Sequence, residues 1–462
     1  MSTIDYQQPA PIEPLPPRGP GLNGFFEIDR RGTTVGREIR GGVTTFLTMA
    51  YILFVNAGIL SAAGMPAPAV ATSTALAAAV CSLIMGLWAN FPLGLASGMG
   101  LNAFFAFTMV PLTHSWQTAM GLFVIDGLVI LLLVIAGLRE AVLDAIPKDL
   151  RMAIGGGIGL FIAFIGLQGA GLVVKHPETM VTAGNFFEPA TGRVLWPPVI
   201  AVIGLILIAA LMLWRVTGAI LIGILACTVV ALFAGATKLP PDLKTAFSGP
   251  DFSVMFHADV MGALKLRPIS LLVALVMSVV LVDFFDTLGT ATAVAEEAGL
   301  MDEKGRIPRI RQILMVDSIA ASIGGLLGAS SVTGYIESAS GVAEGARTGL
   351  QAVVVGILFF LAMFLAPLFG IVPACATAPA LIIVGFLMMA HIADINFKHY
   401  ETAIPAFLTV ILIPLTFSIA HGVGYGFVAQ VLLSVLNGNA RKVHPLLYIV
   451  AGAFVWYFWK GY

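Results

Sequence analysis

Apolar runs of about 20 residues, the length that a helix needs to cross the hydrocarbon core of a bilayer, recur from residue 43 to residue 437. Of the whole chain, 58% is hydrophobic and only 11% is charged, against roughly 25% charged residues in an average soluble domain. The net charge is −1, and no basic run indicates a nucleic-acid partner. These observations predict an all-α polytopic membrane protein embedded in a lipid bilayer.

The apolar runs fall into two groups of seven, so we predict fourteen transmembrane spans. The first group is 43–63, 68–90, 94–111, 117–137, 150–171, 197–214 and 217–235. The second group is 270–291, 310–328, 330–345, 349–367, 371–391, 403–419 and 422–437. The domains predicted from this pattern are a disordered, proline-rich tail (1–24), a first seven-span repeat (25–235), an extracytoplasmic link (236–268), a second repeat (269–437), and a C-terminal basic loop with an apolar segment (438–462).

Lysine and arginine set the orientation of such a chain, because cytoplasmic loops carry an excess of both. With a cytoplasmic N-terminus, seventeen of these residues fall inside and six fall outside. This bias predicts an even number of spans before residue 440. An odd number of spans in each half then places the halves in opposite orientations, as in inverted-repeat transporters, whose sites lie on broken helices at the repeat interface.

The third and tenth spans begin alike, with Leu-Gly followed by small residues and then a polar group. The third reads LGLASGMGLNAFF from Leu93 and reaches Asn102, while the tenth reads LGASSVTGYIESAS from Leu327 and reaches Glu337. Backbone rich in glycine and serine can be extended inside a membrane where it lines a cavity. A helix that starts after such a break directs unpaired N–H groups at the cavity. The alternative is that these glycines only permit close helix packing.

Two carboxylates stand inside apolar spans, Asp286 in LVDFFDTLGT and Glu337 in the tenth span. Such groups are costly in hydrocarbon and normally face a cavity where they have a function. A carboxyl group that titrates near neutrality can take up and release a proton, so the proton-coupling candidates are Asp286, Glu337 and Asp283. The alternatives are a helix-end carboxylate that reaches water for Glu337, a bond to a neighbouring hydroxyl such as Thr287 or Thr290 for Asp286, and capping or local pairing for Asp283.

The three cysteines, Cys81, Cys227 and Cys375, all lie in apolar runs. Their spacing fits neither a metal site nor a disulfide framework, so we interpret them as packing residues. We expect no metal and no cofactor.

Four ordered motifs then resemble the AzgA-like purine permeases, a branch of the nucleobase–cation symporter-2 family that includes relatives of uracil and xanthine permeases. They are TTFLTMAYI (Thr44–Ile52), GMGLNAFFA (Gly98–Ala106), DFFDTLGT (Asp283–Thr290) and YIESASGVAEGARTGL (Tyr335–Leu350). The resemblance extends from Arg31 to at least Tyr448. It implies fourteen spans in two inverted sevens, with spans 1–4 and 8–11 forming a core domain and spans 5–7 and 12–14 a gate domain. Spans 3 and 10 would be half strand and half helix.

The resemblance also implies a function, which is proton-coupled uptake of adenine, guanine or hypoxanthine by an elevator-like movement of core against gate. The location would be the bacterial cytoplasmic (inner) membrane, and a homodimer through the gate domain is the expected assembly. The implied substrate-binding residues are Asp286, Glu337, Asn102, Tyr335, Ile336, Ala103 and Thr45. The wider family's Glu-x-x-Gly-Asp pattern reads Asp286-Thr287-Leu288-Gly289-Thr290 here, so a threonine replaces the second acid.

Three other functions compete with uptake of a base. An anion transporter of the same fold would need a cation near the broken spans, and Arg347 is its one candidate. An intramembrane prenyltransferase would need a second aspartate-rich motif besides DFFD, and no other D-x-x-D segment lies in an apolar span. A receptor would need a signalling domain. We therefore predict a transporter rather than an enzyme.

Overall fold

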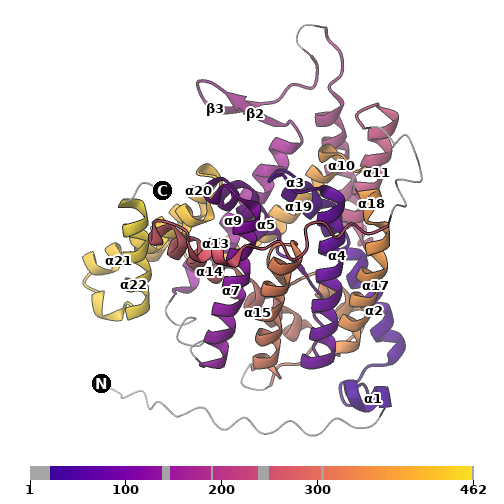
Figure 1. The fold of residues 1–462 in the computed structure, drawn as a ribbon, viewed down its shortest axis with the longest axis horizontal. Coiled ribbons are helices and arrows are strands. Elements are labelled where there is room, and N and C mark those ends of the chain that lie inside the picture. Colours follow the sequence, from indigo (N-terminus) through magenta and orange to yellow (C-terminus); the bar gives the residue numbers. More distant parts are fainter. Residues whose placement is uncertain are drawn as a thin grey trace.

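The computed structural model describes residues 21–137, 146–188, 191–237, 249–302, 306–369 and 371–459, which are mostly helical (Figure 1). The elements of the first half are α1 Gly21–Phe26, α2 Val35–Met49, α3 Ile52–Ser61, α4 Ala67–Ile84, the π-helix η1 Met85–Ala89, β1 Leu95–Ser97, α5 Met99–Phe104, the π-helix η2 Phe105–Met109, α6 Val110–Thr113, α7 Trp116–Ile135, α9 Lys148–Gly169, β2 Val173–His176, β3 Met180–Ala183, α10 Trp196–Leu213 and α11 Ala219–Phe233.

The second half begins with a short helix in the link and continues with elements similar to those of the first half. These are α13 Val260–Leu264, α14 Ile269–Glu297, α15 Ile310–Leu327, β4 Val332–Gly334, α16 Ser338–Ala343, α17 Gly349–Ala362, η3 Met363–Leu365, α18 Ala366–Phe369, α19 Ala374–Met389, η4 Ala390–Asp394, α20 Tyr400–Leu415, α21 Ile419–Leu436, η5 Ala440–Lys442 and α22 Pro445–Trp459.

In the described part of the chain, nine helices are long and apolar enough to cross a bilayer. They are Val35–Ser61, Ala67–Ala89, Trp116–Ile135, Lys148–Gly169, Trp196–Leu213, Ile269–Glu297, Ile310–Leu327, Ala374–Asp394 and Ile419–Leu436. Shorter apolar helices cover four further expected spans and also the segment 446–459. The chain is thus a multi-pass membrane protein, while the count of fourteen spans stays a prediction.

The helices pack in two sets that alternate along the chain. In one set, α7 lies against α15 and α14, α4 against α15 and α17, and α2 against α17 and α16 (Figure 1). In the other set, α9 packs on α19 and α20, α10 on α11 and α19, and α21 on α20. Elements from both halves of the sequence therefore meet within each set.

Two short strands lie inside the expected third and tenth spans. Strand β1 pairs antiparallel with β4, with Ala96 opposite Thr333, and every residue of both strands is buried. The pairing is extended by the N–H of Gly98, which donates to the Ser331 carbonyl at 2.9 Å, and by the N–H of Tyr335, which donates to the Gly94 carbonyl at 3.0 Å. The backbone polar groups of this irregular region are thus satisfied by one another, as the interior of a membrane protein requires.

The N-terminal boundary differs from the predicted tail 1–24, because helix α1 begins at Gly21. Phe26 and Ile28 are buried against Leu350, so apolar packing orders this segment. Residues 1–20 lie outside the described residues. Next to the helix, the buried carboxylate of Glu27 forms ion pairs with Arg31 at 3.1 Å and with Arg309 at 2.8 Å.

The described end of the link, residues 249–268, lies across the ends of α4, α7 and α15. Its backbone N–H groups at Asp251, Phe256 and Asp259 donate to α4 Thr72 Oγ1, the Leu326 carbonyl and the Gln117 carbonyl, respectively. The remainder of the predicted link includes 238–248, which lie outside the described residues. At the other end of the chain, α22 packs on α14 and α21.

Candidate functional site

The paired strands carry a network of hydroxyl groups around Asn102. Ser97 Oγ lies 2.8 Å from Asn102 Oδ1 and 2.8 Å from Ser330 Oγ, and Ser330 Oγ also donates to Asn102 Oδ1. The Asn102 side chain is fully buried in α5, yet its Nδ2 has no hydrogen-bond partner among the described residues. A buried amide donor is seldom left unpaired, so this Nδ2 is a group that a ligand can satisfy.

Glu337 directly precedes α16 and is half-buried. Tyr51, which lies between α2 and α3, donates its hydroxyl to Glu337 Oε1 at 2.6 Å. Tyr335 is buried, and its hydroxyl donates to the Ser97 carbonyl at 2.5 Å. The first, third and tenth expected spans therefore meet at these three side chains.

The two aspartates of the DFFD motif, both in α14, have different surroundings. Asp286 is exposed although it lies near the middle of the long helix, and the Thr333 side chain of β4 lies beside it. Asp286 and Glu337 are close enough to interact electrostatically with each other, and both carboxyl groups also interact electrostatically with Tyr51. Asp283 is fully buried and accepts a hydrogen bond from Ser331 Oγ at 3.0 Å. The motif thus directs one carboxyl toward the accessible side and the other into the protein.

The structure places Asn102, Tyr335, Glu337 and Asp286 around the strand pair. Of the other predicted site residues, Ala103 is buried in α5 beside Asn102 and Ile336 is exposed beside Glu337. Thr45 is buried in α2, where its hydroxyl accepts a hydrogen bond from Gln351 Nε2 of α17 at 2.8 Å. Their assignment as substrate-binding residues stays a prediction.

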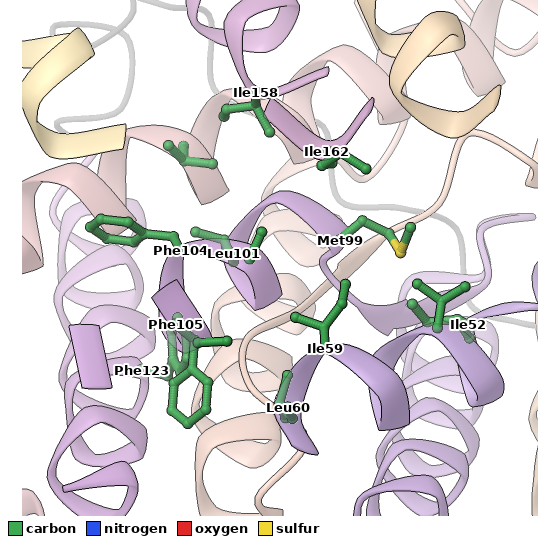
Figure 2. Close-up of a cluster of buried hydrophobic side chains, with 14 of the residues drawn as sticks. Ile52, Ile59, Leu60, Met99, Leu101, Phe104, Phe105, Phe123, Ile158 and Ile162 are labelled. Carbon is green, nitrogen blue, oxygen red and sulfur yellow. The ribbon is translucent and has the colours of Figure 1, made fainter. Parts of the chain in front are cut away.

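Helix α5 is held in place by hydrophobic packing on both sides. Figure 2 shows its Met99 and Leu101 side chains between Ile59 and Leu60 of α3 on one side and Ile158 and Ile162 of α9 on the other. All six side chains belong to one buried hydrophobic cluster. The contact with α9 is close, because a Cβ added at Gly100 would lie 2.5 Å from Ile158 Cγ2. Asn102 is therefore positioned by well-packed neighbours rather than by a loose loop.

Two further buried acids belong to this region and were not predicted. Asp126 of α7 and Asp317 of α15 are fully or almost fully buried in helices that pack on one another. Each is a single acid in an apolar stretch, which is the signal that identified Asp286. Tyr51 is likewise closer to the site than its sequence context indicated. Within the described residues, no group of three histidine, cysteine or acidic side chains is arranged to hold a metal ion.

Comparison with known proteins gives a consistent set of matches. The profile described as "Permease family" matches residues 36–424. The guanine/hypoxanthine permease PbuG of Bacillus subtilis is 43% identical over 447 residues, which cover 95% of this chain and 99% of that protein. The adenine permease AdeP of Escherichia coli is 41% identical over 441 residues, which cover 94% of this chain and 95% of that protein.

Solved structures give a likeness of fold. The transmembrane domain of the cyanobacterial bicarbonate transporter BicA has a TM-score of 0.63 at 13% identity, and the match covers 84% of this chain and 97% of that one. The murine anion transporter Slc26a9 in its inward-facing state has a TM-score of 0.65 at 10% identity, over 88% of this chain and 69% of that one.

Proposed function

The chain belongs to the Permease family, and on that premise we propose that it is a proton-coupled purine nucleobase transporter of the bacterial cytoplasmic membrane. The family resemblance expected from the sequence motifs is confirmed, as is the expectation of a transporter rather than an enzyme. Relatives named for guanine, hypoxanthine and adenine support a purine as the substrate.

The observation that carries this proposal is the pair of acids beside an unpaired amide. A purine is planar, and its edges carry N–H donors together with carbonyl or ring-nitrogen acceptors. Glu337 and Asp286 would accept from the N–H groups, and Asn102 Nδ2 would donate to an acceptor. A base lacking the acceptor would leave the buried Asn102 amide unpaired, which gives strong selectivity.

The remaining predicted site residues would contact the base through their backbone groups or hold the residues that do. Tyr335 and Ile336 precede Glu337, and Ala103 follows Asn102, so their backbone groups would lie along the same base. Thr45 would act through α2, one turn before Thr48, whose hydroxyl lies 3.1 Å from Ser340 Oγ of α16. The strands β1 and β4 would hold both halves of the site in one body.

Protons would enter through the accessible carboxyls, Asp286 and Glu337. The first packing set, which contains α7, α14, α15 and the strand pair, would be the core domain, and the set around α9 and α19 would be the gate. We propose that the loaded core slides against the gate, with the N-terminus in the cytoplasm and a homodimer formed through the gate. The anion-transporter alternative has less support, because the Arg347 guanidinium donates to the carbonyls of Val342 and Ala346 at 2.6 and 2.7 Å.

The test is uptake of labelled hypoxanthine into cells stripped of their own purine permeases, with and without a protonophore. We expect saturable uptake that collapses with the proton gradient, and competition by unlabelled adenine, guanine, xanthine and uracil then ranks specificity. Uptake that is unchanged by the protonophore would refute proton coupling. No uptake of any purine by a well-expressed protein would refute the substrate class.

A substitution at Glu337 tests whether this residue binds the base. Glu337→Gln should weaken base binding to the purified protein roughly 10- to 150-fold, since a hydrogen bond to a charged group contributes about 1.5–3 kcal/mol. The matched control is Glu344→Gln. Glu344 is exposed, and its Oε2 lies 4.0 Å from Arg40 Nε. Equal affinity in the two variants would contradict the role of Glu337.

A further inference from the structure

Three carboxyl groups are buried together behind the strand pair, on helices α7, α14 and α15. They are Asp126, Asp283 and Asp317, whose exposed fractions are 0%, 0% and 2%. These helices pack on one another, and Gly127, next to Asp126, lies against Ser318, next to Asp317. Of the three, only Asp283 is among the proton-coupling candidates predicted from the sequence.

Asp126 of α7 and Asp283 of α14 lie on helices that pack together, and their side chains are close enough to interact. Neither carboxyl oxygen of Asp126 has a donor among the described residues, and the same holds for Asp283 Oδ1. An ionised carboxylate can only accept a hydrogen bond. A hydrogen bond between these two groups therefore requires a proton on one of them, as in other carboxyl pairs that share one proton.

In the described part of the chain, no basic group is among the charges that act on the pair. The groups that act on it electrostatically are further acids, namely Asp317 on α15 and Asp286 on α14. Other titratable groups stand on or next to the elements packed against α7 and α14. They are His114 after α6, Lys148, Asp149 and Arg151 of α9, Asp259 and Lys265 beside α13, Arg267, Glu296 and Glu297 before or in α14, Arg309 and Arg311 at the start of α15, Tyr335 after β4, Glu337 and Glu344 beside α16, His421 and Tyr425 of α21, and His444, Tyr448 and Tyr457 before or in α22.

The space beside the pair is closely packed. A Cβ added at Gly127 would lie 2.4 Å from the Ser318 carbonyl oxygen and 2.3 Å from Ser322 Oγ. The backbones of α7 and α15 therefore approach each other directly beside Asp126. This packing favours a bare proton over a hydrated cation as the occupant, because close-packed interiors contain few voids as large as a water molecule.

The pair is connected to the candidate substrate site by short steps. Asp283 lies one helical turn before Asp286, and it accepts the hydrogen bond from Ser331, which directly precedes β4. Thr287, on the next turn, hydrogen-bonds to Thr333 of β4 at 2.8 Å and also contacts Asp317. A change of charge on the pair would thus act on the strand that leads to Tyr335 and Glu337.

We propose that the Asp126–Asp283 pair is a second proton-binding site of the transport cycle, separate from the carboxyls that face the base. One proton binds between the two carboxyl groups and changes the charge of the pair from −2 to −1. Binding and release of this proton shift β4 through Ser331. Asp126 acts here as a positioning residue for the proton on Asp283. The inference rests on the proposed function, because it needs a transport cycle to couple to.

The decisive variant is Asp126→Asn in the full-length protein, purified and reconstituted in proteoliposomes. The asparagine amide donates permanently to Asp283 and so imitates the protonated pair. We expect base binding and base-for-base exchange to persist, while accumulation driven by an inward proton gradient is lost and the pH profile of uptake flattens. The matched control is Asp149→Asn. The Asp149 carboxylate accepts a hydrogen bond from the Thr402 hydroxyl at 2.8 Å and is not part of the pair, so this variant should behave as the unmodified protein.

An unchanged pH profile and unchanged accumulation in Asp126→Asn would overturn the inference, because the proton would then be a fixed structural one. If the variant does not fold, the infrared carboxyl band of the unmodified protein, labelled at aspartate and recorded with and without base, decides the matter. A protonated-aspartate band that changes on binding supports the site, and one that stays constant refutes it. Failure of the unmodified protein to bind or carry any purine would instead refute the proposed function.

Discussion

A carboxylate of helix α2 caps the first turn of α17, and this contact predicts a measurable loss of stability in Glu38→Gln. Glu38 is fully buried and accepts from the backbone N–H groups of Arg347 at 2.7 Å, Thr348 at 3.2 Å and Gln351 at 3.1 Å. Thr348 is the N-cap residue of α17, so the carboxylate satisfies donors that a helix start leaves unpaired. Its negative charge also suits the positive end of the helix dipole.

The magnitude follows from what the glutamine can still do. Its amide oxygen can keep the contacts with Arg347 and Thr348 as neutral hydrogen bonds, which are weaker by about 1 kcal/mol each than bonds to a charged group. Its NH₂ group would face the N–H of Gln351, leaving a buried donor unpaired at a cost of about 1–3 kcal/mol. A neutral amide is easier to bury than a carboxylate and offsets part of this loss. We expect a net destabilisation of about 3 kcal/mol.

The assay is thermal unfolding of the purified protein in detergent, with Glu344→Gln as the control. The unfolding entropy is about 2.1 cal/mol/K per residue, so a chain of 462 residues that unfolds as one unit should lose about 3 °C in Tm. The control should stay within about 0.5 kcal/mol of the unmodified protein, because Glu344 is exposed and its ion pair is long. Equal Tm values for the two variants would refute the capping role.

Three further outcomes are expected. Gly426→Ala places a Cβ 1.9 Å from Thr409 Oγ1 and should destabilise the protein by about 1–3 kcal/mol, with most of the loss recovered in Tm when Thr409→Ala is added. Arg309→Ala removes a 2.8 Å ion pair from buried Glu27 and should speed proteolysis of residues 21–34, whereas Arg30→Ala, whose side chain is 57% exposed, should not. The three cysteines are buried, so a maleimide should label them only after unfolding, which mass spectrometry would detect.

The sequence predicted the polar residues of the candidate site because a carboxyl or amide group is conspicuous in an apolar helix. Asp286, Asn102 and Glu337 were found in this way, and the short strands lie where the small residues of the third and tenth spans cluster. Helical boundaries were less accurate where polar residues continue a helix. Helix α2, for example, begins at Val35, eight residues before the expected span, because Thr34 caps it and accepts from the Arg37 N–H at 3.3 Å.

What could not be predicted is which distant groups meet. Tyr51 reads as an ordinary polar residue of the first span, and its bond to Glu337 joins residues 286 positions apart. Asp126 and Asp317 carry the same local signal as Asp286, but nothing in their own stretches indicates that α7 and α15 bring them together beside Asp283. Such partners depend on the packing of whole helices, which local pattern does not encode.

The pairing of β1 with β4 also constrains how the chain is made. Tyr335 bonds the Ser97 carbonyl across 238 positions, so the segment that holds β1 leaves the ribosome long before its partner exists. At synthesis rates of about 5–20 residues per second, the delay is on the order of tens of seconds. During this time the polar backbone of residues 95–97 has no partner strand, and exposure to lipid would be costly. The first half of the protein must therefore be sheltered by water or by the insertion machinery until the tenth span arrives, so its biogenesis ends only when the two halves join.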